Sequence, residues 1–158
     1  MKTDDHQLMR SVELLRSFAS VQKNLFCFVQ RSAVENGLSI PQYNILMTLI
    51  SHTEMTQKTL GEKTYLPKST LSQAVDGLVK EGLLERQQVE GNRREMLLSL
   101  NEKGIERIKT IHLQESGIHR VVQKVLDALE PGEAERLLET HARIASLLET
   151  IEPKEQLK

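Results

Sequence analysis

Two long amphipathic segments occupy the ends of the chain. In the first, apolar residues recur at alternating intervals of four and three positions, which predicts one face of a helix from about residue 5 to residue 35. The members of this seam are Leu14, Phe18, Val21, Leu25 and Phe28. The last helix repeats the spacing with Leu137, His141, Ile144, Leu148 and Ile151. The apolar surface of the two seams is larger than a small central module can cover, so we infer that both helices pair with another subunit.

Shorter helices follow in the middle of the chain. Ser39 and Gln42 can form a reciprocal capping box that starts a second helix. Thr56 is placed to cap a short third helix, and after a turn Pro67 starts a fourth helix that ends at Gly82. The two short helices and the turn between them predict a helix-turn-helix.

A hairpin and a longer helix come next. The strand-like runs LLERQ and EMLLSL flank Gly91-Asn92, which predicts a β-hairpin. Asn101 then caps a helix that we expect to continue without interruption to Leu129. The final seven residues, 152–158, are expected to fray.

The fourth helix has two unlike faces. Leu71, Ala74, Val75, Leu78 and Val79 recur at helical spacing and must face a core. The first two turns otherwise carry small hydroxyls, a carboxamide and a cation: Lys68, Ser69, Thr70, Ser72 and Gln73. Small polar side chains let a helix approach base edges closely, so this front predicts a surface that reads DNA in the major groove.

The hairpin completes a winged helix-turn-helix. Arg93 and Arg94 lie at its tip, where they can reach a neighbouring minor groove or its phosphates. The net charge is −1, but residues 57–94 hold seven Lys or Arg against five Asp or Glu, whereas residues 130–158 hold four against seven. The positive excess therefore falls where contact with double-stranded DNA requires it.

The composition limits the remaining possibilities. Apolar residues make up 39% and charged residues 27% of 158 positions, as in a soluble globular protein. No stretch approaches the roughly 18 apolar residues of a membrane helix, and MKTDDHQ lacks the layout of a signal peptide. We expect one continuous domain in the cytoplasm, with no membrane partner.

Catalytic and metal chemistry have little support in the sequence. The single cysteine, Cys27, excludes an internal disulfide, and the five histidines include no H-x3-H pair. A Gly-rich phosphate loop and a nucleophile motif are both missing. We expect no enzymatic activity, no cofactor and no metal site.

Residues 60–104 read LGEKTYLPKSTLSQAVDGLVKEGLLERQQVEGNRREMLLSLNEKG and carry a specific series of short features. The features are Leu60-Gly61, Ser69-Thr70, Asp76, Leu78, Lys80-Glu81-Gly82-Leu83, Glu85-Arg86, Arg93-Arg94 and Glu102-Lys103-Gly104, with Leu38-Ser39 and Gln42 upstream. This series closely resembles the MarR family of bacterial transcription regulators. The resemblance covers about residues 36–104 by motif and the whole chain by the order of its helices.

The resemblance implies a mainly α protein with a small β wing: a winged helix-turn-helix with long N- and C-terminal dimerisation helices. It implies a homodimer that binds a pseudo-palindromic operator, usually represses, and releases DNA on binding a small-molecule effector or on oxidation. Residues 1–36 and 102–152 would form the dimerisation region and residues 37–101 the DNA-binding domain. The expected dimerisation residues are Leu14, Phe18, Leu137, Ile144, Leu148 and Ile151.

Two positions depart from the family pattern. Asn92 stands where an aspartate is common, which removes a charge pair that would brace the wing. Asn101 stands where a threonine is common, and asparagine caps a helix equally well.

Alternatives to ligand-controlled repression remain open. Some MarR relatives sense peroxide through a cysteine on the first helix, and a reactive thiol needs polar or charged neighbours. Cys27 lies between Phe26 and Phe28, so we expect a buried, inert thiol. A winged helix can also act as a protein-interaction module, which predicts no salt-dependent affinity for DNA.

The other chemically versatile side chains have simple packing interpretations. His141 fits a partly exposed interface position, although His112, His119 and His141 could converge across a dimer as a metal sensor. The methionines at positions 47, 55 and 96 are interpreted as gap fillers rather than ligands.

Overall fold

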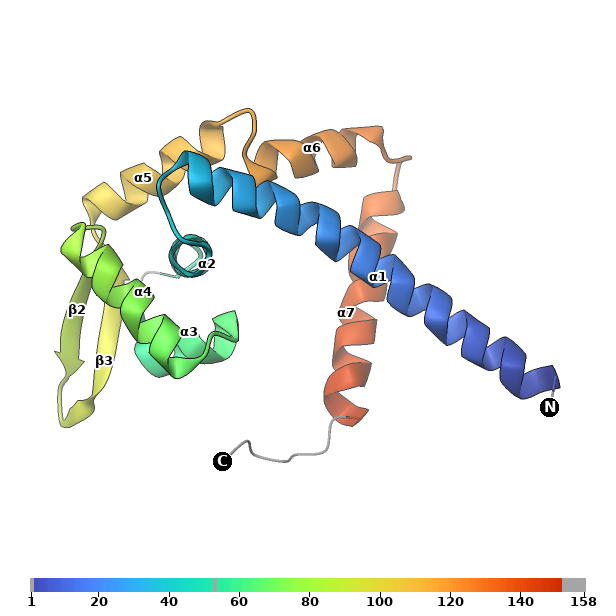
Figure 1. The fold of residues 1–158 in the computed structure, drawn as a ribbon, viewed down its shortest axis with the longest axis horizontal. Helices are drawn as coiled ribbons and strands as arrows, with labels where there is room; N and C mark the ends of the chain where they lie inside the picture. Colours follow the sequence, from blue (N-terminus) through green and yellow to red (C-terminus); the bar gives the residue numbers. More distant parts are fainter. Residues whose placement is uncertain (1, 53, 152–158) are drawn as a thin grey trace. The chain divides into compact units, whose positions relative to one another are not determined.

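The computed structural model describes residues 2–52 and 54–151, so the tail at 152–158 that was expected to fray lies outside the described residues (Figure 1). The chain divides into two units, Met1–Arg120 and Val121–Lys158. The elements are α1 (Lys2–Glu35), α2 (Ile40–Leu49), β1 (Glu54–Thr56), α3 (Gln57–Thr64), α4 (Lys68–Lys80), β2 (Leu84–Val89), β3 (Asn92–Leu100), α5 (Glu102–Leu113), α6 (Ile118–Ala128) and α7 (Glu133–Ile151). None of the helices in the described ranges is long and apolar enough to cross a membrane.

The predicted helix starts are confirmed at α2, α3 and α5. The Ser39 hydroxyl accepts a hydrogen bond from the N–H of Gln42 at 3.3 Å, and the Gln42 side chain accepts from the N–H of Ser39 at 2.9 Å. The Thr56 hydroxyl accepts from an N–H of α3 at 3.1 Å, and the Asn101 side chain accepts from an N–H of α5 at 2.8 Å. These bonds satisfy first-turn amides that have no partner within their own helix.

The sheet has the strand order β1-β3-β2, with both pairs antiparallel. β2 and β3 form the predicted hairpin, and Gly91 at its tip has a φ of 80°, which glycine adopts without strain. β1 was not predicted, because three residues are too few to show an alternating pattern. Its central residue, Met55, is buried and pairs with Leu98 of β3.

The core of the first unit lies where α4 packs against α2 and the hairpin (Figure 1). The predicted stripe of α4 is buried at Leu71, Ala74, Val75 and Leu78 and half-buried at Val79. The other elements contribute fully buried aliphatic side chains, among them Ile45, Leu46, Leu49, Leu98 and Ile108. Burial of one such side chain contributes roughly 1.5–3 kcal/mol, so the stripe decides which face of α4 remains in solvent.

The long helix predicted after Asn101 is interrupted at residues 114–117, so that prediction was wrong. At the break, Gln114 is extended and its carboxamide exchanges two hydrogen bonds with Asn36, at 2.9 and 3.0 Å. Gly117 is buried there, and a Cβ on it would lie 2.9 Å from a carbonyl oxygen of α5. Hydrogen bonding to the residue that follows α1 therefore overrides an apolar periodicity that continues through the break.

Gly104 allows α5 to approach the loop after α4, and its substitution tests that contact. A Cβ at Gly104 would lie 2.2 Å from the carbonyl oxygen of Leu83, which is shorter than real contacts allow. We expect Gly104→Ala to force the two segments apart and to lower the free energy of unfolding by about 2 kcal/mol, as measured by urea denaturation.

Gly77→Ala in α4 is the matched control. A Cβ at Gly77 would meet the end of the Gln42 side chain at 2.6 Å, and that side chain can rotate away. The gain of about 1 kcal/mol in helix propensity offsets the disturbed Gln42 bond, so the expected change is small. A Gly104→Ala protein as stable as the wild type would contradict the close approach of α5.

Candidate nucleic-acid interface

A tight turn joins α3 to α4. Tyr65 ends α3 in the left-handed region, with a φ of 54°, and its side chain is 91% exposed. Pro67 follows and disfavours a helical conformation at Leu66, so α3 cannot run directly into α4. The sequence predicted this turn, but not that a tyrosine would take the left-handed position.

The first turn of α4 is available to an outside partner. Pro67 is the residue before the helix, and no side chain caps it, so the first N–H groups have no acceptor within the helix. Lys68, Ser69 and Gln73 are exposed in the same region. Uncapped N–H groups next to a lysine favour an anion such as phosphate, and a glutamine carboxamide can pair with an adenine edge.

Two residues of the predicted reading set are less accessible. Thr70 is half-buried, and the half-buried Ser72 hydroxyl accepts a hydrogen bond from the Gln57 side chain of α3 at 3.2 Å. Ser72 therefore helps to hold α3 against α4, while its own O–H remains a donor. Sequence spacing did not reveal this contact, because Gln57 and Ser72 lie on different helices.

Local hydrogen bonds order the wing. The Asn92 side chain accepts from the N–H of Arg94 at 3.1 Å and donates to the Glu95 carboxylate at 3.3 Å. A neutral side chain thus braces the tip at the position where the family commonly has an aspartate. Arg93 and Arg94 are both exposed.

An ion pair ties the base of the wing to α4. The Arg86 guanidinium of β2 lies 2.7 Å from the Asp76 carboxylate. Such a surface pair contributes only about 0–1 kcal/mol to stability, but it restricts how strand and helix sit relative to each other. Sequence reasoning noted both residues as family features and did not pair them, because charge alone does not identify a partner ten positions away.

The front of α4 and the wing share one face. A groove of about 750 Å³ lies between α3, α4 and β3, and both Lys68 and Arg94 line it. Gln57, Leu66 and Asn92 are among its other lining residues. The helix front and the wing arginine can therefore contact the same partner.

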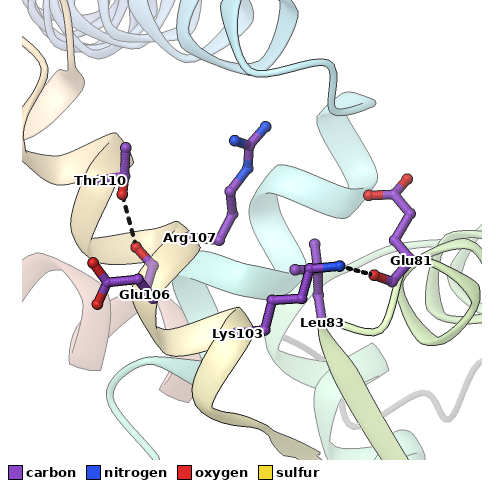
Figure 2. A pocket seen from close by; sticks show the side chains of 6 residues that line it. All are labelled: Glu81, Leu83, Lys103, Glu106, Arg107 and Thr110. Atoms are coloured by element: carbon purple, nitrogen blue, oxygen red, sulfur yellow. Dashed lines mark hydrogen bonds between the residues drawn. The ribbon is translucent and has the colours of Figure 1, made fainter.

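A second hollow, of about 500 Å³, lies where the end of α4 meets α5 (Figure 2). The Lys103 ammonium donates to the Glu81 carbonyl oxygen at 2.8 Å, and the Thr110 hydroxyl donates to the Glu106 carbonyl oxygen at 2.9 Å. Arg107 donates to the carbonyl oxygen of Asn36. Two cations of α5 thus hold the ends of α4 and of α1.

The predicted dimerisation residues are largely open to solvent. Leu14, Leu137, Leu148 and Ile151 are exposed, and Phe18 and Ile144 are half-buried. None of the described residues of α7 is buried. Apolar stripes of this length are unfavourable in water unless another surface covers them.

Cys27 is exposed, which corrects the expectation of a buried thiol. Its neighbour Phe26 is itself 46% exposed. The described part of α1 is buried only near its end, at Ser32 and Ala33, so apolar neighbours in the sequence do not imply burial at position 27.

The histidines do not form a conventional metal centre. Among the residues that the structure describes, no three His, Cys, Asp or Glu side chains gather as ligands. His112 and His119 do meet, with ring centroids 4.0 Å apart, whereas His141 belongs to the second unit. Burial and, secondarily, the charge of His119 lower the pKa of His112 below its ordinary 6.5, which keeps that imidazole neutral near pH 7.

Comparison with known proteins agrees with this geometry. Residues 36–95 match the sequence profile of the MarR family. The chain is 29% identical over 118 residues to the organic hydroperoxide resistance transcriptional regulator of Bacillus subtilis (strain 168), covering 75% of each protein. The structure of Sco3205, a MarR family transcriptional regulator from Streptomyces coelicolor in complex with DNA, is similar with a TM-score of 0.71 at 23% identity, over 92% of this chain and 90% of that one. NadR in complex with 4-hydroxyphenylacetate is similar with a TM-score of 0.70 at 17% identity, over 83% and 89%. Residues 36–95, which hold α4 and the wing arginines, thus match the MarR family in sequence, and the chain has the fold of MarR family winged-helix transcriptional regulators.

Proposed function

We propose that the protein is a repressor that binds a pseudo-palindromic operator as a homodimer and is released by a small-molecule ligand. The groove shared by Lys68 and Arg94 carries the DNA part of this proposal, because it brings helix front and wing to one face. A single duplex then receives α4 in the major groove and the wing arginines at the minor groove or its phosphates. The residues assigned to α4's contact are Lys68, Ser69, Thr70, Ser72 and Gln73, and those of the wing are Arg93 and Arg94.

The exposed apolar seams support the homodimer. Both α1 and α7 present these seams, and a second copy supplies a surface of matching chemistry and length. A two-fold dimer presents two copies of α4 to DNA, which is why a pseudo-palindromic operator fits.

The hollow of Figure 2 supports release by a ligand. Lys103 and Arg107 there hold carbonyl oxygens at the ends of α4 and α1. A ligand that takes over these donors frees both helix ends from α5 and changes the position of α4. Binding to DNA is weakened because ligand and operator then favour different arrangements. NadR, which was solved with 4-hydroxyphenylacetate, is a protein of the same fold that holds a small molecule.

Substitutions at Gln73 and Arg94 separate base reading from phosphate contact. Gln73→Ala is expected to cost roughly 1–3 kcal/mol of operator affinity and to relax preference at one position per half-site. Arg94→Ala is expected to weaken binding to operator and scrambled DNA alike. It should also reduce the slope of log affinity against log salt concentration, the salt slope, by about one unit per half-site. Fluorescence anisotropy across a salt series, with DNA from the chain's own promoter region, measures both effects.

Lys109→Ala is the control for a lost positive charge, since Lys109 is exposed on α5, outside the groove shared by helix and wing. Its salt slope should match the wild type. The placement of helix and wing is wrong if Arg94→Ala leaves the slope untouched while Gln73→Ala weakens all sequences equally. Salt-independent binding by the wild type would favour a protein-interaction module instead.

Leu148→Glu tests the dimer. A charge placed in an apolar interface must be desolvated without a partner, so this change should dissociate or unfold the protein. Glu149→Lys, a charge reversal at the exposed neighbouring position of α7, should leave the dimer intact. Sedimentation velocity at micromolar concentration measures both variants, and a folded wild-type monomer under these conditions would refute the homodimer.

Thiol sensing through Cys27 is the second candidate, and the exposure of that thiol favours it. The similar Bacillus subtilis protein is an organic hydroperoxide resistance regulator, which adds support. If ligand binding alone controls release, Cys27→Ser should bind and release operator DNA as the wild type does, with or without an organic hydroperoxide. Hydroperoxide-dependent release that disappears in Cys27→Ser, in the same anisotropy assay, would establish the thiol mechanism in its place.

A further inference from the structure

Three soft or borderline metal ligands lie around His112, and none of them lines the groove shared by Lys68 and Arg94. Met47 comes from α2, His112 from α5 and His119 from α6. The His112 Nε2 atom lies 3.2 Å from the Met47 Sδ atom, and the two imidazole rings lie 4.0 Å apart at an interplanar angle of 65°. Met47 and His112 are half-buried, while His119 is exposed. Two members of the cluster are therefore partly enclosed by the protein, and the third is accessible to solvent.

The break between α5 and α6 builds this cluster. In a continuous helix, residues seven positions apart are separated by a rise of roughly 10.5 Å, so His112 and His119 could not bring their rings together. The turn at residues 114–117 changes the direction of the chain, so the two histidines on either side of it come close together. The hydrogen bonds between Gln114 and Asn36 hold this turn in place. The histidine pair thus depends on a feature that the apolar pattern alone does not predict.

We propose that Met47, His112 and His119 bind one Cu(I) ion. Thioether sulfur is a soft ligand that selects Cu(I), and imidazole also suits copper, whereas harder divalent cations prefer oxygen ligands. With metal–nitrogen and metal–sulfur bonds like those of zinc, a tetrahedral angle separates the two donor atoms by about 3.5 Å. The observed 3.2 Å between Nε2 and Sδ requires only a small adjustment. All three ligands are neutral, so the bound ion keeps its single positive charge.

Such an ion would connect α2, α5 and the first turn of α6, through residues that all belong to the first unit. α2 packs against α4, and α5 holds the end of α4 through Lys103. Cu(I) binding to the folded state alone raises stability in proportion to the logarithm of free metal over its dissociation constant. The site is separate from the proposed ligand hollow, which none of these three residues lines.

The test uses Cys27→Ser protein, because a thiol is itself a strong soft ligand. Full-length protein is titrated with Cu(I) under argon against a chromophoric Cu(I) chelator. The expected result is one Cu(I) per chain. Met47→Leu and His119→Gln should each weaken binding at least tenfold, since loss even of a residue that only supports a ligand costs about 10–100-fold. Met47→Leu conserves volume, so the fold is expected to persist.

Met96→Leu and His52→Gln are matched controls, because Met96 is also half-buried and His52 is also exposed. Their affinity for Cu(I) should equal that of the Cys27→Ser protein. X-ray absorption should show a sulfur neighbour of copper at about 2.3 Å that disappears in Met47→Leu. Failure of the Cys27→Ser protein to hold Cu(I), equal losses in the controls, or a copper spectrum without sulfur would each overturn the proposal.

Discussion

The burial of one face of α4 is the constraint on which the rest of the structure depends. Leu71, Val75 and Leu78 leave water together, and each contributes roughly 1.5–3 kcal/mol by doing so. Turning the helix by half a turn would expose them and would bury Asp76 and Lys80, whose charges are costly to desolvate. The polar front of α4 faces solvent because its opposite face has to be buried. A surface for DNA is thus fixed by packing before any DNA is present.

Contacts of α5 secure the helices on either side of this core. At the end of α4, Asn101 donates to the Gly82 carbonyl oxygen at 2.7 Å, and Gly104 lies against Leu83 without space for a side chain. At the end of α1, Arg107 donates to the carbonyl oxygen of Asn36. One helix therefore contacts both the element that we assign to dimerisation and the element that we assign to DNA reading. In the proposed release mechanism, a change in the position of α5 therefore acts on both elements through direct contacts.

Local chemistry made much of the fold predictable from the sequence. The Ser39 and Gln42 capping box, the stripe of α4 and the turn at Gly91 depend on neighbours within one helix or hairpin, and all three are present. Tertiary contacts decided the rest. Gln114 forms a hydrogen bond with Asn36, and Gln57 forms one with Ser72. The residues of each pair are far apart in the sequence, and no periodic pattern indicates that they are in contact. Cys27 was misplaced for the same reason, because a helix that extends beyond its core leaves apolar neighbours exposed.

Hydroxyl-radical footprinting of the wild-type protein on DNA from its own promoter region tests the central claim, that α4 and the wing of two subunits bind one operator. The expected result is two equivalent protected regions related by two-fold symmetry. Their centres should lie about one helical turn, roughly 10–10.5 base pairs, apart, with further protection in the flanking minor grooves. A single asymmetric protected region, or protection confined to one groove, would contradict the joint placement of α4 and the wing on DNA.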